Sequence, residues 1–268
     1  MKYTIWDPTG NITALVESNI DKERQLSVAA AIMARHPRVE QVGFVEFKED
    51  NLPVHLHMAG GEFCGNAAMS AAALYLMRTE QPSGMTHSVR ISVSGALSPL
   101  EVILTEKDNK MYSASLQTPW TASVDYRQFC FQSQNGLLPV VDLGGISQII
   151  IEPDSVFYEM LNNRSDAESA VRQWCSALSA PCLGLMFLNN KDDVCDMTPL
   201  VYVPGTGTMF WENSCASGST AVCMYYAVKT DADVKLVLKQ PGGVLCVQCQ
   251  GPGEPVVLKG TTSLVQFD

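Results

Sequence analysis

Basic residues and long apolar runs are both scarce in this chain. Its 268 residues include 18 Lys and Arg against 28 Asp and Glu, so the formal net charge is −10 at pH 7. Clustered Lys and Arg are needed to neutralise phosphates, and their shortage argues against a nucleic-acid partner. No segment approaches the roughly 20 apolar residues of a membrane span, and the N-terminus has no signal-peptide pattern. We therefore expect a cytoplasmic protein with a small-molecule partner and no membrane partner.

A disulfide framework and a metal site also find little support. The nine cysteines are an odd number and have no regular spacing, so most are expected to be small buried residues of a reducing compartment. Cys246 and Cys249 have CxxC spacing but no second ligand pair, and we interpret them as strand residues. His55 and His57, separated by Leu56, could form a zinc site with Cys64, but no fourth ligand is evident. No metal is predicted.

Two cysteines lie in sequence motifs that indicate a function. Cys64 lies in Gly60-Gly61-Glu62-Phe63-Cys64-Gly65-Asn66-Ala67, and Cys215 lies in Phe210-Trp211-Glu212-Asn213-Ser214-Cys215-Ala216-Ser217-Gly218. Each precedes a predicted helix. The helix dipole and the N-terminal backbone N–H groups favour a thiolate, so both cysteines are expected to have lowered pKa values. Two such positions in one chain indicate paired thiols at one active site.

The order of predicted elements repeats along the chain. Most of the chain is β-rich, and the helices are predicted at Lys22–Arg35, Asn66–Met77, Asp166–Leu178 and Ser217–Val228. In each half a strand, a helix and another strand precede a cysteine-capped helix. This pattern predicts an α+β protein with two similar halves. We expect an N-terminal domain over 1–117 that carries Cys64 and takes the C-terminal strand 262–268, and a second domain over 118–261 that carries Cys215.

Paired thiols at helix N-termini suit a particular reaction. Backbone N–H groups can bind a carboxylate there, and the candidates are Gly65, Asn66, Ala216 and Ser217. If the carboxylate belongs to an amino acid, one thiolate can remove its α-proton and the other thiol can return a proton to the opposite face. The helix-terminal N–H groups would stabilise the charge that develops. This scheme inverts the α-carbon and needs no cofactor.

These motifs resemble the diaminopimelate epimerase-like family of two-cysteine, cofactor-independent racemases and epimerases. The match covers nearly the whole chain and includes Gly10-Asn11, Glu40-Gln41, Glu62–Asn66, Glu212–Gly218, Gln240–Gly243 and Lys259-Gly260. The resemblance implies two pseudo-symmetric domains, each a β-barrel-like sheet around a central helix, and a homodimer. It also implies that Cys64 and Cys215 are the acid–base pair, that Asn11, Gln41 and Asn66 contact the substrate, and that Glu212 holds its α-ammonium.

The chain departs from the family pattern at three places. Where the epimerase has an Arg after the glutamate, this chain has Asn213, and its last Arg is Arg172. An expected Asn-Pro-His reads Gly145-Ile146-Ser147, and an expected Asn reads Gly184. A second substrate carboxylate buried without a cation would cost several kcal/mol, so diaminopimelate is a poor candidate substrate.

Within the family, the chain most resembles the histidine racemase branch, which supplies D-histidine for opine-type metallophores. The tracts that carry this resemblance are Thr9–Thr13, Glu40–Phe44, Glu62–Ala67, Trp211–Cys215 and Gln240–Gly243. An imidazole needs an acceptor for its N–H, or an anion if it is protonated. Glu40 is the candidate for that contact. The sequence therefore predicts a racemase that interconverts L- and D-histidine.

Three alternatives stay open. The substrate could be another amino acid, such as a diamino acid. A cysteine-nucleophile hydrolase would need a His near its cysteine, and all four His, at positions 36, 55, 57 and 87, lie in the first half. An amino-acid-binding protein without catalysis is the third, although both thiols are intact.

Overall fold

The chain forms two compact units. The computed structural model describes residues 1–191 and 194–267. Unit 1 consists of Met1–Pro119 and the C-terminal segment that begins at Val257, and unit 2 consists of Trp120–Val256. The C-terminal segment pairs with the strand Met111–Gln117, from Val257 opposite Gln117 to Ser263 opposite Met111. Continuous pairing therefore places 257–261 in unit 1, whereas the sequence assigned these residues to the second domain.

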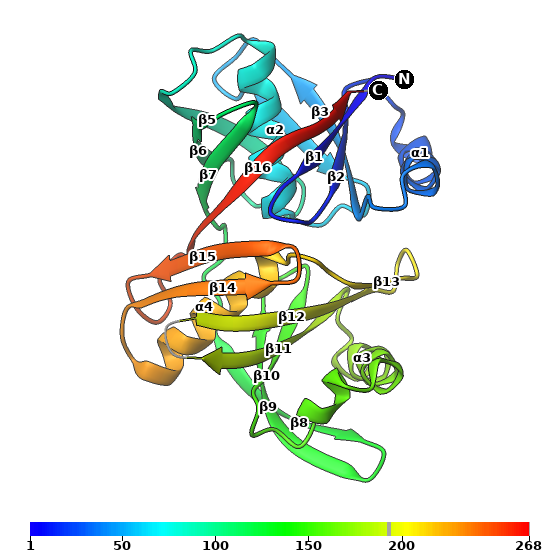
Figure 1. Cartoon of the computed structure of the whole chain (residues 1–268). Coiled ribbons are helices and arrows are strands. Elements are labelled where there is room, and N and C mark those ends of the chain that lie inside the picture. Colours follow the sequence, from blue (N-terminus) through cyan, green and yellow to red (C-terminus); the bar gives the residue numbers. More distant parts are fainter. Residues whose placement is uncertain (192–193, 268) are drawn as a thin grey trace. The chain divides into compact units, whose positions relative to one another are not determined.

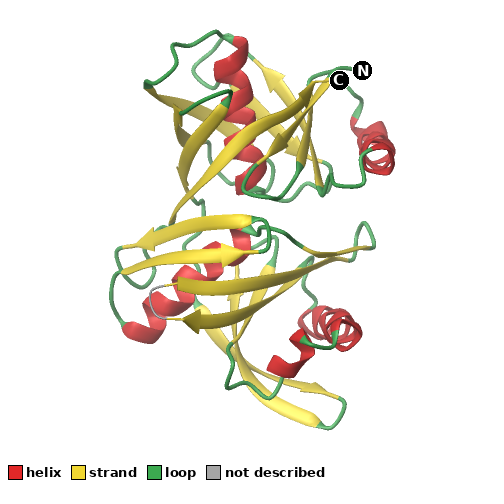
Figure 2. Ribbon diagram, in the orientation of Figure 1, coloured by secondary structure: helices red, strands yellow, loops and turns green. Residues whose placement is uncertain are grey.

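Unit 1 is a closed sheet around a helix (Figures 1 and 2). Its strands are β1 (Tyr3–Asp7), β2 (Thr13–Val16), β3 (Gln41–Phe47), β4 (Val54–Met58), β5 (Thr86–Val93), β6 (Leu100–Glu106), β7 (Met111–Gln117) and β16 (Val257–Phe267), and its helices are α1 (Lys22–Arg35) and α2 (Gly65–Arg78). The strands pair in the order β1 to β7 and then β16, and β16 pairs back with β1. Closure leaves this sheet without a free edge.

Unit 2 repeats this order of elements. Its strands are β8 (Val124–Phe131), β9 (Gln134–Asp142), β10 (Ser147–Ile151), β11 (Leu183–Lys191), β12 (Val194–Val203), β13 (Thr208–Trp211), β14 (Val234–Gln240) and β15 (Gly243–Cys249). Its helices are the 3₁₀ helix η1 (Tyr158–Leu161), α3 (Arg164–Leu178) and α4 (Ala216–Thr230). The pairing order is β15-β14-β12-β11-β10-β9-β8, and β13 pairs with β12.

The same crossovers occur in both units. The parallel pairs β2–β3 and β10–β11 are connected through α1 and through η1 and α3 respectively. The parallel pairs β4–β5 and β12–β14 are connected through α2 and α4. The predicted α+β class, with a sheet around a central helix in each half, is therefore confirmed. The cysteine-bearing helices occupy equivalent places in the two units.

The central helices are apolar on nearly all sides. α2 is rich in alanine and is buried from Gly65 to Leu74, and it packs against strands all around unit 1. A helix that is apolar all round is stable only when it is enclosed, which explains its place inside the sheet (Figure 1). In contrast, α1 buries only Ala29 and Ile32 and packs on the outside of the sheet. Helix composition therefore decides which helix is enclosed.

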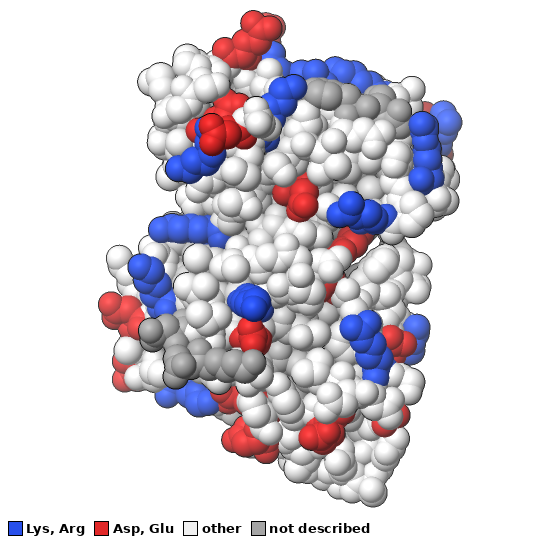
Figure 3. Space-filling view, viewed as in Figure 1, with Lys and Arg blue, Asp and Glu red and all other residues white. Residues whose placement is uncertain are grey.

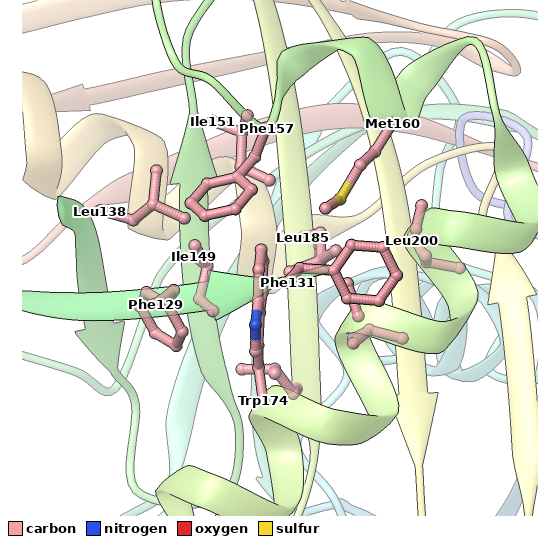
Figure 4. Close-up of a cluster of buried hydrophobic side chains, with 14 of the residues drawn as sticks. Phe129, Phe131, Leu138, Ile149, Ile151, Phe157, Met160, Trp174, Leu185 and Leu200 are labelled. Atoms are coloured by element: carbon pink, nitrogen blue, oxygen red, sulfur yellow. The ribbon is translucent and has the colours of Figure 1, made fainter. Parts of the chain in front are cut away.

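A second core in unit 2 fixes the orientation of β10. Trp174 of α3 packs against Phe129 and Phe157 with ring centroids 4.9 Å and 5.0 Å apart, and its indole N–H donates to the Cys130 carbonyl at 2.9 Å (Figure 4). Ile149 of β10 belongs to this cluster. Side chains alternate along a strand, so Gln148 points to the opposite face, where α4 lies.

The described helices are too short or too polar to cross a membrane. On the face that Figure 3 shows, Lys and Arg are scattered among Asp and Glu and separated by uncharged side chains.

Candidate active site

Cys64 caps the central helix of unit 1. Its backbone is extended, with φ −131° and ψ 106°, and its sulfur accepts a hydrogen bond from the Ala67 N–H at 3.4 Å. The carbonyl of Cys64 accepts from the Ala68 N–H, which starts the helical ladder. Gly65 and Asn66 follow in the first turn, where helical N–H groups have no helical acceptor and can bind an anion. The predicted helix N-terminus at this cysteine is confirmed.

Three predicted binding residues meet at the start of the β2–β3 pair. The side-chain amide N–H of Asn11 donates to a carboxylate oxygen of Glu40 at 3.0 Å. The backbone N–H groups of Glu40 and Gln41 both donate to the Ile12 carbonyl, at 2.9 Å and 3.3 Å. Asn11 is 1% exposed, and its side-chain carbonyl has no hydrogen-bond partner among the described residues. A buried acceptor of this kind fits a donor group on a ligand.

Glu62 is a further carboxyl group in this unit, and the residue is half-buried. Burial raises its pKa, while the backbone N–H groups of Glu62 and Gly60 oppose the rise. The residue belongs to the cysteine motif, but the sequence assigned it no role.

Cys215 caps the central helix of unit 2 in the same way. Its φ of −117° and ψ of 107° are extended, and its sulfur accepts from the Gly218 N–H at 3.3 Å. The hydroxyl of Ser217 lies 3.5 Å from the same sulfur. The sequence expected only the backbone of Ser217 to act here, and the structure adds its side chain. Ala216 begins the helix between these groups.

The pKa of Cys215 differs from the expectation. Burial raises it well above the ordinary thiol value, and the charge of Glu212 and a hydrogen bond with Glu212 raise it further. The Ser217 hydroxyl and the Gly218 N–H lower it but do not prevail. The expected lowering by the helix N-terminus is therefore wrong for Cys215, because burial outweighs the helix dipole. Burial therefore favours the thiol form of Cys215, whose sulfur is in hydrogen-bond contact with Glu212.

Gln240 holds the backbone of Cys215. Its side-chain carbonyl accepts from the Cys215 N–H at 2.7 Å, and its amide N–H donates to the Ser219 hydroxyl at 3.1 Å. Ser219 in turn donates to the Cys215 carbonyl at 2.7 Å. The motif that begins at Gln240 was noticed in the sequence, but its contact with Cys215 was not.

Gln148 is a site residue that the sequence analysis missed. Its side-chain amide N–H donates to the Ser217 hydroxyl at 3.0 Å. The available signal was a glutamine directly before the apolar run Ile149–Ile151 of β10.

The cysteine hydrolase and the metal site are not supported by the contacts within either unit, as far as the structure describes it. Unit 2 contains no histidine, so Cys215 has no imidazole within its own unit. The four His are in unit 1, where His36 contacts the Tyr3 hydroxyl at 2.9 Å and His87 contacts the Pro82 carbonyl at 3.0 Å. Across the described residues, no three His, Cys, Asp or Glu side chains cluster as metal ligands.

Comparison with known folds agrees with this architecture. A protein from Pseudomonas aeruginosa described as a predicted epimerase superposes with a TM-score of 0.69 at 14% identity, covering 100% of this chain and 98% of that one. A methylitaconate-delta-isomerase superposes with a TM-score of 0.63 at 10% identity, covering 100% and 94%. At these identities the likeness concerns the fold alone.

Sequence relatives are more specific. The histidine racemase of Staphylococcus aureus strain Mu50 is 26% identical over 279 residues, which cover 99% of this chain and 95% of that protein. A histidine racemase of Fusobacterium nucleatum subsp. nucleatum is 30% identical over 242 residues, covering 89% and 86%. The family model for the N-terminal domain of the histidine racemase CntK matches residues 1–265. With the fold and both cysteine motifs in agreement, the chain belongs to the histidine racemase family.

Proposed function

We propose that this enzyme interconverts L- and D-histidine by a two-base reaction between Cys64 and Cys215. The main support is that, in a chain of the histidine racemase family, both cysteines cap equivalent central helices in two repeated units. Duplicated fold units with one helix-capping thiol each suit a reaction that needs one base and one acid.

The raised pKa of Cys215 sets the resting protonation state in this proposal. Burial favours the thiol form of Cys215, and we assign the thiolate to Cys64 because the reaction needs one acid and one base. The Cys64 thiolate takes the α-proton, and the electron pair of the broken C–H bond moves into the substrate carboxylate. The Cys215 S–H then gives its proton to the opposite face of the α-carbon. The enantiomer reacts with the roles exchanged, and no cofactor or oxidant is consumed.

The substrate groups have candidate partners in both units. Backbone N–H groups at Gly65, Asn66, Ala216 and Ser217 would bind the carboxylate, as helix N-termini do for anions. Glu212 would bind the α-ammonium, as the resemblance implies; it is 7% exposed, so water screens its charge only weakly.

The imidazole would contact the polar group at the start of β3. Glu40 already accepts one hydrogen bond from Asn11, and a carboxylate can accept several more. The unsatisfied carbonyl of Asn11 offers a second acceptor for an imidazole N–H. Gln41 begins β3 beside them. We also propose a cytoplasmic homodimer that supplies D-histidine to an opine-type metallophore, as the resemblance implies.

The test uses purified enzyme with L-histidine and D-histidine in D₂O. We expect incorporation of deuterium at the α-carbon together with loss of optical activity. Cys64→Ser and Cys215→Ser should each abolish racemisation, while Cys130→Ser, at an exposed position, should not change it. If either single variant racemises histidine at the native rate, the two-base reaction is wrong. If histidine is inert and a diamino acid reacts, the substrate assignment is wrong.

A further inference from the structure

Gln148 is a buried amide with one of its two polar ends occupied. The residue is 0% exposed, although the following residues of β10 are apolar. Its amide N–H donates to the Ser217 hydroxyl at 3.0 Å, and its side-chain carbonyl has no hydrogen-bond partner among the described residues. Burying a polar side chain in this way is costly, so the position calls for an explanation beyond packing.

Gly184 creates the space that this amide occupies. The two residues are paired across the parallel strands β10 and β11. A methyl group added at Gly184 would overlap the side-chain carbonyl oxygen of Gln148 and approach the Met186 methyl to 2.8 Å. Gly184 is one of the places where the chain departs from the family pattern. The structure gives a reason for glycine at this position: without a side chain, Gly184 on β11 leaves room for the buried amide of Gln148 on β10.

The hydrogen bond from Gln148 fixes the direction of the next one. An amide N–H can only donate, so the Ser217 oxygen is its acceptor. The hydroxyl proton of Ser217 is then available to another acceptor, and the Cys215 sulfur lies 3.5 Å from the Ser217 oxygen. We propose that Gln148 is a positioning residue that holds Ser217 as a hydrogen-bond donor to the sulfur of Cys215 when that sulfur has lost its proton. This inference rests on the proposed acid–base role of Cys215.

The other groups around Cys215 allow the sulfur to exchange partners. Glu212, which precedes the helix, supplies the negative charge that acts on the sulfur and takes a hydrogen bond from the thiol. Gln240 of β14, which binds the Cys215 backbone, and Met186 of β11, whose sulfur lies beside Gly218, are both uncharged. The thiol therefore donates to Glu212, and the thiolate accepts from Ser217 and from the Gly218 N–H. Such an exchange suits a residue that must be acid in one direction and base in the other.

The inference predicts the direction in which the pKa of Cys215 changes. Gln148→Met removes the amide donor with little change in length, so the Ser217 hydroxyl is free to turn away and the thiolate loses support. Gln148→Glu replaces the amide by a group that accepts, and the Ser217 proton is drawn away from the sulfur. Both variants should raise the pKa of Cys215 by about one pH unit, a tenfold lower thiolate fraction at a given pH. Gly184→Ala should have the same effect without altering either side chain.

The experiment measures the thiolate of Cys215 directly. Iodoacetamide alkylation is followed across pH by peptide mass mapping, with Cys64 in the same molecules as an internal reference and thiolate ultraviolet absorbance as a second readout. Gln128→Met, at an exposed position on β8, is the control and should leave the Cys215 midpoint unchanged. If Gln148→Met does not fold, Gly184→Ala and Gln148→Glu provide the same comparison.

A double-mutant comparison separates positioning from packing. Ser217→Ala should itself raise the midpoint, and adding Gln148→Met to it should produce no further shift. An equal shift in both backgrounds, or no shift from Gln148→Met, would overturn the inference. Because alkylation does not require turnover, the outcome is independent of the racemase assignment. A shifted midpoint with full racemisation by Cys215→Ser would refute the proposed function and leave the Gln148 contact standing.

Discussion

The side-chain carbonyl of Gln240 accepts a hydrogen bond from the backbone N–H of Cys215 at 2.7 Å. Gln240 ends β14, and Cys215 precedes α4, so this contact attaches the start of the central helix to the sheet. Both residues are buried. Through Gln240, the position of the sulfur depends on a strand that carries no reacting group.

Gln240→Met should reduce turnover more than substrate binding. The variant removes the acceptor of the Cys215 N–H and the amide donor to the Ser219 hydroxyl. A small displacement of a reacting group raises the activation barrier. We expect kcat to fall about tenfold, equivalent to about 1.4 kcal/mol in the activation barrier, with a smaller change in KM. Steady-state kinetics with L-histidine measure both.

Two variants control for that result. Ser219→Ala removes the second hydrogen bond of Gln240 and the one from Ser219 to the Cys215 carbonyl, but it keeps the contact of Gln240 with the Cys215 N–H and should reduce kcat less. Gln128→Met, on the exposed part of β8, should match the native enzyme. A Gln240→Met enzyme with native kcat, or with a change in KM alone, would contradict a positioning role.

Glu212→Gln should lower the pKa of Cys215. Burial is the largest cause of the raised pKa, and the negative charge and hydrogen bond of Glu212 add to it. Removing the charge eases ionisation, so the midpoint for thiolate formation should move down by about one to three pH units. Thiolate absorbance across pH, relative to Cys215→Ser, reports it. The KM for histidine should rise as well if Glu212 binds the ammonium.

The matched control is Glu254→Gln, which removes an exposed carboxylate from the same unit. It should change neither the midpoint nor KM. A Glu212→Gln midpoint that stays in place or moves upward would show that the carboxylate does not face the sulfur in solution.

The enclosed helices and their caps could be predicted from sequence alone. Their signals are local: a cysteine in an extended cap, then an apolar, alanine-rich segment. The predicted ranges Asn66–Met77 and Ser217–Val228 agree with α2 and α4 to within two residues at each end. The α+β class follows from the same pattern.

Two strands gave no such signal. The first residues of β8 are mostly exposed, and all four residues of β13 are half-buried. The alternation of buried and exposed residues that marks a strand is therefore absent, and neither strand was predicted. Both form because a neighbouring strand offers hydrogen bonds, β9 for β8 and β12 for β13.

The surroundings of Cys215 depend on distant residues. Gln148 and Ser217 are 69 positions apart and meet because β10 packs against α4. The direction of the Cys215 pKa likewise depends on how deeply the thiol is buried. The helix N-terminus is visible in the sequence and favours the thiolate, whereas burial opposes it and is visible only in the fold.

Glu17 offers a test of stability in unit 1. Its side chain is 7% exposed and accepts two hydrogen bonds from Arg78, at 2.9 Å and 2.6 Å, and one from Lys2 at 3.0 Å. Burial opposes ionisation of this carboxyl, but the hydrogen bonds from Arg78 and Lys2 outweigh it and lower the pKa. Because the folded-state pKa is below the unfolded one, Glu17 stabilises the fold above the unfolded-state pKa. That contribution is lost as pH falls through the folded-state pKa.

Glu17→Gln should therefore destabilise the protein by about 2 kcal/mol at pH 7, because a buried bidentate contact to Arg78 is lost. The difference from the native protein should shrink in acid, where Glu17 is itself protonated. Urea unfolding at pH 7 and at about pH 3, below the ordinary glutamate pKa, measures both values. Glu46→Gln is the control: its ion pair with Lys48, 3.6 Å long, is exposed and should contribute little at either pH. A Glu17→Gln difference that is equal at both pH values, or larger in acid, would show that ionised Glu17 does not stabilise the fold.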